Sequence, residues 1–170
     1  MKKYCAMLLP VLFLTFLNNT TAQDKAKVAS PPATATEKMG DKNITIAYAQ
    51  PSVKKRKIFG ELVPFGKVWR TGANGATTFT IDKDVKIEGK ELKAGKYALF
   101  TIPTEKEWTI IFNKKSDQWG AYDYSDKDDV LSVKVPAGKA AKMTEMMTFT
   151  VKDGKVSLTW DTTEVSFQVK

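Results

Sequence analysis

The sequence predicts an all-β fold, an antiparallel β-sandwich or jelly-roll-like structure built as a single domain. Apolar and polar residues alternate with a period of two in several short segments, and turn sequences separate those segments. After residue 43, the segment nearest to an apolar repeat with helical spacing is AAKMTEMM at 140–147. A chain of 170 residues, 42% of them hydrophobic, is long enough for one ordinary core and too short for two.

The first 22 residues predict a signal peptide. Lys2 and Lys3 precede an apolar run over residues 7–17, and a small-residue site ends at Ala22. The apolar run is about half as long as the ~20 residues that a membrane-spanning helix needs. The only cysteine, Cys5, lies before this run, whereas lipid attachment needs a cysteine directly after it. We therefore expect cleavage after Ala22, export to the periplasm or the cell exterior, and no transmembrane segment in the mature chain.

Residues 23–42 predict a flexible leader. They are rich in Ala, Thr, Pro and Lys and include no aromatic residue. Such a composition offers little apolar surface to offset the entropic cost of ordering the chain. We therefore expect the folded β-sandwich domain to span residues 43–170.

Within that domain, two kinds of apolar pattern predict strands. Alternation over residues 44–48 and 78–81 is typical of strands with one buried face. Residues 95–103 and 107–113 are apolar at nearly every position, which predicts central strands covered on both faces. The TEKE segment that separates the last two is expected to form a hairpin turn.

Glycine-containing dipeptides predict the other turns. Asp153-Gly154 and Glu88-Gly89 stand between short strand-like runs and favour tight hairpins. Asn74-Gly75 lies in GKVWRTGANGATTF, residues 66–79, whose glycine spacing fits neither a Walker phosphate loop nor a dinucleotide fingerprint. We therefore expect Asn74-Gly75 to be a hairpin turn between KVWRT and ATTFTI.

Four segments that follow one another along the chain carry a family resemblance: RKIFGELVPFGKVWRTGANGATTF, AGKYALFTIP, EWTIIFNK and DQWGAYDY. Together they resemble the domain of unknown function 2911 family, exported bacterial proteins of one small domain. The resemblance covers roughly residues 44–135 and extends more loosely to the end of the chain. It implies that the Trp-Arg-Thr-Gly-Ala-Asn and Gln-Trp-Gly-Ala-Tyr stretches are hallmarks of the domain. It implies no activity and no cofactor.

Composition excludes several kinds of chemistry. The chain has no histidine, and Cys5 belongs to the predicted signal peptide, so Ser-His-Asp and Cys-His catalysis and histidine- or thiolate-bound zinc are excluded. The net charge of +8 comes from scattered lysines, which indicates a solvated surface rather than a nucleic-acid partner. The acidic run at 123–129 lacks the mid-loop glycine and terminal glutamate of a calcium loop. We expect no metal and no cofactor.

The candidate ligand-binding residues come from the two hallmark stretches: Trp69, Arg70, Asn74, Asp117, Trp119 and Tyr122. Arginine binds carboxylate or phosphate through two donors, and Trp and Tyr can stack on sugar rings or anchor peptides. Structural alternatives remain open, because the aromatic residues can be core and Arg70 can form an internal ion pair with Asp117 or Glu61.

Three functions follow from these alternatives. The first is a non-catalytic binding module for a glycan, a peptide or a small anionic ligand. The second is a structural or envelope-associated interaction protein. The third, a hydrolase that uses carboxylates, lacks a pair of acidic residues whose spacing marks an acid and a base.

Overall fold

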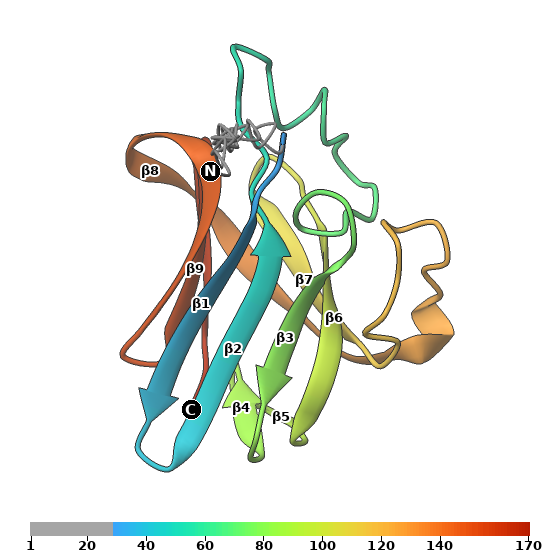
Figure 1. The fold of residues 1–170 in the computed structure, drawn as a ribbon, viewed down its shortest axis with the longest axis vertical. Coiled ribbons are helices and arrows are strands. Elements are labelled where there is room, and N and C mark those ends of the chain that lie inside the picture. Colours follow the sequence, from blue (N-terminus) through green and yellow to red (C-terminus); the bar gives the residue numbers. More distant parts are fainter. Residues whose placement is uncertain (1–28) are drawn as a thin grey trace, which may run out of the picture.

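The computed structural model describes residues 29–170, which form a single domain of antiparallel β-strands (Figure 1). The main sheet has the order β1-β2-β3-β6-β7-β8-β9, and β4 and β5 form a small second sheet. The strands are β1 Pro32–Met39, β2 Lys42–Ala49, β3 Thr77–Ile81, β4 Val85–Ile87, β5 Lys90–Leu92, β6 Gly95–Ile102, β7 Glu107–Asn113, β8 Asp129–Lys152 and β9 Lys155–Gln168. One 3₁₀ turn, η1 Asp126–Asp128, precedes β8. The predicted all-β, antiparallel class is confirmed.

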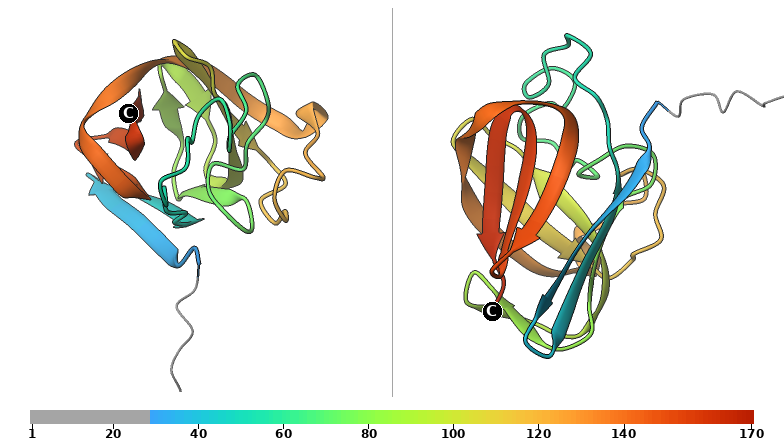
Figure 2. Two further views of the ribbon diagram at one scale, coloured as in Figure 1. Left: turned by 90° about the horizontal axis from the view of Figure 1, so that it is seen from above. Right: turned by 60° about the vertical axis from the view of Figure 1, so that its left-hand side comes forward.

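The main sheet curls on itself, so that its inner face encloses the core (Figure 2). The long strand β8 makes this possible, because its pairing with β9 shifts register between Lys139 and Thr144 and again before Thr148. The first part of β8 pairs with β7, and β8 also contacts β1 at the other edge of the sheet. One curled sheet thus supplies both layers of the core. Residues 140–147, the nearest sequence match to a helix, belong to β8.

The core lies on the inner face of this sheet. Ile44, Ile46, Phe79 and Phe112 are fully buried there, and each such side chain contributes about 1.5–3 kcal/mol relative to an exposed one. A smaller cluster of Ala98, Phe100 and Ile111 lies on the other face of β6 and β7. These two strands are therefore covered on both faces, as predicted.

Two predicted hairpin turns have the expected backbone. Asp153 and Gly154 have φ of 52° and 72°, and Glu88 and Gly89 have φ of 47° and 82°. Positive φ at both central residues is the geometry of a type I′ turn, whose twist matches that of the flanking strands.

The prediction of a flexible leader over residues 23–42 is wrong for β1. This strand pairs with β2 along its whole length, and its alternate side chains Ala33, Ala35 and Met39 pack against the core. The Glu37 carboxylate accepts the backbone N–H groups of Asp153 and Gly154 at 2.6 and 3.1 Å. Backbone pairing and one carboxylate clamp thus order a segment that is poor in apolar residues.

The predicted signal peptide, residues 1–22, lies outside the described residues. Within residues 29–170, no helix has the length and apolar character required to cross a membrane.

Candidate functional site

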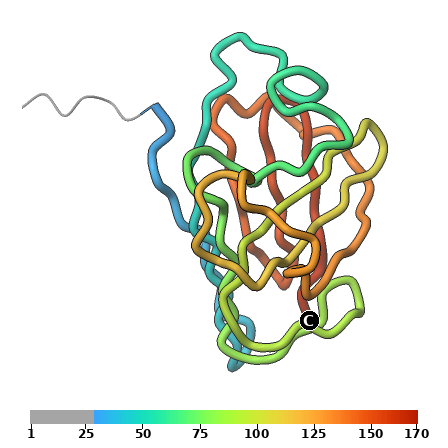
Figure 3. The backbone as a smooth tube through the Cα atoms, turned by 90° about the vertical axis from the view of Figure 1, so that its right-hand side faces the viewer, coloured from blue at the N-terminus to red at the C-terminus, as the bar shows by residue number. Residues whose placement is uncertain are grey.

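The two hallmark stretches form neighbouring loops on the outer face of β6 and β7. We call residues 68–76 the Arg70 loop and residues 114–125 the Trp119 loop; the latter faces the viewer in Figure 3. Gly75 and Trp119 form an isolated antiparallel bridge, and the Ala76 N–H donates to the Gln118 carbonyl at 3.0 Å. Both loops cover the outer cluster around Phe100. The segments that carry the predicted site residues therefore meet.

Trp69 belongs to the core and not to this surface. Its side chain is 8% exposed, and its ring stacks on Trp160 with centroids 5.8 Å apart and an interplanar angle of 17°. The indole Nε1–H donates to the Gly72 carbonyl at 3.1 Å. These contacts correct the prediction of Trp69 as a ligand-binding residue, because its faces and its polar atom are already occupied.

Arg70 points outward from the same backbone. Trp69 pairs with Thr101 of β6 through backbone hydrogen bonds of 2.8 and 2.9 Å, and side chains alternate along an extended chain. Since Trp69 faces inward, Val68 and Arg70 face outward. Val68 packs on the outer cluster.

The Arg70 side chain is half-buried and lacks an internal partner. Its Nε is buried with no acceptor, and Arg70 forms no ion pair within residues 29–170. Of the two predicted acidic partners, Glu61 pairs with Lys57 at 3.2 Å, and Asp117 is exposed. The internal ion-pair alternative is therefore absent from the structure.

Thr71 fixes the backbone next to Arg70 in a strained conformation. It is buried and has φ of 54°, which is rare for a β-branched residue and costs on the order of 1–3 kcal/mol. Its Oγ1 lies 3.2 Å from Thr101 Oγ1, and its carbonyl accepts the Thr77 hydroxyl at 2.8 Å. Strain of this kind persists where the surroundings over-determine the backbone, and it clusters at functional sites.

The turn at Asn74 differs from the prediction in one respect. Asn74 has the expected positive φ, 59°. The residues before it, KVWRT, do not form a strand paired with β3, because Trp69 pairs with β6 and Gly75 pairs with Trp119. The stretch is a loop that extends from the edge of β6, which leaves Asn74 exposed.

A buried asparagine holds the Trp119 loop. Asn113 donates its amide to the Ser125 carbonyl at 3.0 Å and to Asp129 at 2.8 Å. Its carbonyl oxygen accepts the Lys115 N–H and the Gln118 amide, each at 3.1 Å. All four hydrogen-bonding positions of the Asn113 side chain are therefore used.

Charged groups brace the far end of this loop. Hydrogen bonds and ion pairs from Lys115 and Lys114 hold the pKa of Asp128 below its ordinary value. Burial raises the pKa of Tyr124, and its hydroxyl donates to Asp129 at 2.7 Å, which raises it further. The acidic run at 123–129 thus contributes side chains to internal contacts, and residues 29–170 contain no group of three or more acidic side chains placed to hold a metal.

The remaining predicted residues lie on the surface of the two loops. Trp119 and Tyr122 are 66% and 83% exposed, and Asn74 and Asp117 are exposed as well. The arrangement combines an unpaired arginine with two accessible aromatic side chains.

The family model for a protein of unknown function, DUF2911, matches residues 30–169. The chain belongs to the DUF2911 family. No curated protein and no solved structure matched it. The match begins beside β1, which agrees with the corrected start of the DUF2911 domain.

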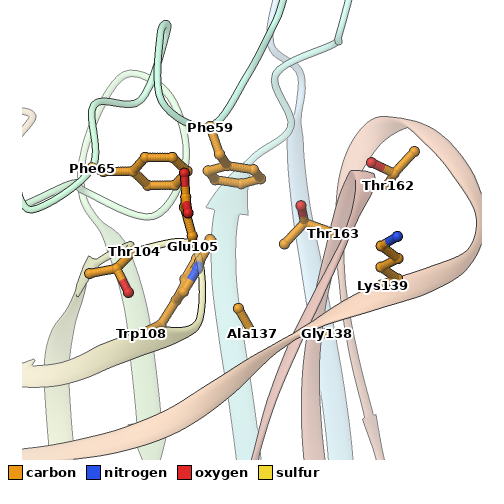
Figure 4. A pocket seen from close by; sticks show the side chains of 10 residues that line it. All are labelled: Phe59, Phe65, Thr104, Glu105, Trp108, Ala137, Gly138, Lys139, Thr162 and Thr163. Carbon is orange, nitrogen blue, oxygen red and sulfur yellow. The ribbon is translucent and has the colours of Figure 1, made fainter.

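The DUF2911 domain also has a groove at one end of the curled sheet, and none of the predicted site residues lines it (Figure 4). Its volume is about 290 Å³, and its lining residues are Phe59, Phe65, Thr104, Glu105, Trp108, Ala137, Gly138, Lys139, Thr162 and Thr163. Sequence reasoning missed this groove because four separate segments form it. The one local signal was the pair of phenylalanines in the Gly- and Pro-containing run IFGELVPFG.

Proposed function

We propose that this DUF2911 domain is a non-catalytic binding module that recognises a small anionic ligand at the Arg70 and Trp119 loops. One observation carries the proposal: Arg70 is half-buried, with a buried Nε that has no acceptor and with no acidic partner in residues 29–170. Because that Nε is enclosed by protein atoms, a ligand oxygen would reach the guanidinium through its terminal Nη1 and Nη2 donors, which no acidic side chain in residues 29–170 occupies.

The ligand class follows from the chemistry of the surrounding side chains. A guanidinium matches the two oxygens of a carboxylate or phosphate group. Trp119 adds a broad apolar face, and Asn74 adds an exposed amide. The exposed carboxylate of Asp117 disfavours a polyanion. We therefore favour a ligand with one anionic group and an apolar or ring-shaped body, with Tyr122 at the edge of the site.

The test is an NMR titration of the purified protein, read at the Arg70 Nε–H signal, with succinate, benzoate and inorganic phosphate as probes. We expect a saturable shift with at least one of these probes. Charge-assisted hydrogen bonds contribute about 1.5–3 kcal/mol, so Arg70→Lys should weaken binding by a factor of about 10–100. Arg56→Lys is the matched control, because Arg56 is exposed and donates only to backbone carbonyls.

The same variant separates binding from a purely structural role. If Arg70 recognises a ligand, Arg70→Lys should leave the melting temperature of the free protein nearly unchanged. A loss equivalent to about 1–3 kcal/mol without ligand, together with no response to any probe, would favour the structural or envelope-associated alternative.

We also place this module outside the cytoplasm, on the strength of the predicted signal peptide. Mass spectrometry of the exported protein should find Gln23 as the first residue. A product that retains Met1 and stays in the cytoplasm contradicts this location.

A further inference from the structure

We propose that the groove at the end of the curled sheet is a second binding site, distinct from the proposed anion site at Arg70, and that it takes a neutral sugar. Its volume of about 290 Å³ is at the lower end of the range for ligand pockets. That size suits one ring or the end of a longer chain.

Aromatic side chains form one side of the groove. Phe59 and Phe65 lie side by side above Trp108 in Figure 4. Phe65 is 38% exposed, and Phe59 packs edge-on against Trp108 with ring centroids 4.9 Å apart. Aromatic faces of this kind cover the C–H faces of a sugar ring.

Phe65 is held in place before any ligand arrives. A Cβ atom on Gly60 would lie 2.9 Å from the Phe65 ring, so the ring rests directly on the Gly60 backbone. The Gly66 N–H donates to the Pro103 carbonyl at 2.8 Å, which ties this loop to the β6–β7 turn. A fixed aromatic face loses little entropy on binding.

Small residues of β8 leave the space empty. Ala137 and Gly138 line the groove where β8 passes the β6–β7 turn, and the Ala137 N–H donates to the Lys106 carbonyl at 2.9 Å. A Cβ atom on Gly138 would lie 3.2 Å from the Glu164 carbonyl oxygen, so this glycine lets the backbone of β9 approach closely beside the groove.

Polar side chains face the same space from both ends. Glu105 and Lys139 carry opposite charges, and neither forms an ion pair in the part of the chain that the structure describes. The hydroxyls of Thr162 and Thr163 lie on the Lys139 side. A carboxylate, an ammonium group and hydroxyls together offer donors and acceptors without net charge, which matches the hydroxyls of a neutral sugar better than an anion.

The test is an NMR titration of the purified protein with glucose, galactose, N-acetylglucosamine and cellobiose, read at the Gly138 and Thr163 amides. We expect at least one sugar to shift these signals saturably. Phe65→Ala should weaken the binding of that sugar about threefold to tenfold, and Glu105→Gln should weaken it about tenfold. Leu62→Ala and Glu107→Gln are the matched controls, because both residues are exposed neighbours outside the groove.

The outcomes separate this site from the anion site. Arg70→Lys should leave sugar binding unchanged, and Phe65→Ala should leave the phosphate and succinate titrations unchanged. Glu105 is at an exposed turn, so its variant tests the groove even if Phe65→Ala lowers stability. The proposal is overturned if no sugar shifts the signals of the groove amides, or if the control variants weaken sugar binding as much as Phe65→Ala and Glu105→Gln do. It is also overturned if a neutral tetrapeptide binds in the groove and the sugars do not.

Discussion

Replacing Asn113, the last residue of β7, by alanine should destabilise the domain more than any single polar substitution within the Trp119 loop that it holds. Asn113 is 0% exposed and makes four hydrogen bonds, to Ser125, Asp129, Lys115 and Gln118. Asn113→Ala leaves these partners without it, and each buried group that stays unpaired costs about 1–3 kcal/mol. Part of this cost is recovered, because the former partners of Asn113 in the loop can hydrogen-bond to water. We therefore expect the free energy of unfolding to fall by about 3 kcal/mol in total, which lowers Tm by about 10 °C for a domain of this size.

The assay is urea unfolding at pH 7, with Tm measured by calorimetry. Asn43→Ala is the control, because Asn43 hydrogen-bonds Asp82 at an exposed site and should cost less than about 1 kcal/mol. Asn113→Asp keeps the shape but places a carboxylate 2.8 Å from Asp129, so its stability should recover as the pH falls towards about 4. A loss below about 0.5 kcal/mol for Asn113→Ala would refute the claim that this network holds the loop.

Three further outcomes test the fold. Gly154→Ala should lower the free energy of unfolding by at least about 2 kcal/mol, because the new Cβ would lie 2.5 Å from a backbone carbonyl oxygen. Gly89 has a similar φ but open space around it, so Gly89→Ala should lower it by about 1 kcal/mol. Denaturant unfolding of the two variants measures this difference. Deleting residues 29–39 should lower Tm by about 5 °C or more, and an unchanged calorimetric Tm would show that β1 contributes nothing. Hydrogen bonds from Asn43 hold the pKa of Asp82 below its ordinary 3.8, so this stabilisation is full above about pH 4 and is lost as pH falls through the lowered pKa. Asp82→Asn should therefore flatten the fall of Tm between about pH 5 and pH 2, and an equally steep fall would contradict the assignment.

Local chemistry was sufficient where the deciding interactions lie close together in the chain. Asp153-Gly154 and Glu88-Gly89 predicted their hairpins because few residues adopt the positive φ that such turns require. The continuous apolar runs 95–103 and 107–113 predicted strands covered on both faces, since water-facing positions would not all be apolar. The sequence by itself therefore determined the all-β class and several strand boundaries.

Tertiary structure decided what depends on partners distant in the chain. Composition predicted a flexible leader over residues 23–42, because it reflects only the side chains. Pairing with β2 and the contacts of the Glu37 carboxylate order residues 32–39 of that segment. The alternation that turns Trp69 inward and Arg70 outward depends on the Trp69–Thr101 pair. Likewise, the end groove exists only because the bend of β8 carries Lys139 to the same end of the sheet as Phe59 and Phe65. Hydrophobic periodicity and turn residues indicate the local backbone conformation. They do not indicate which distant segment of the chain will pair with that backbone and satisfy its hydrogen bonds.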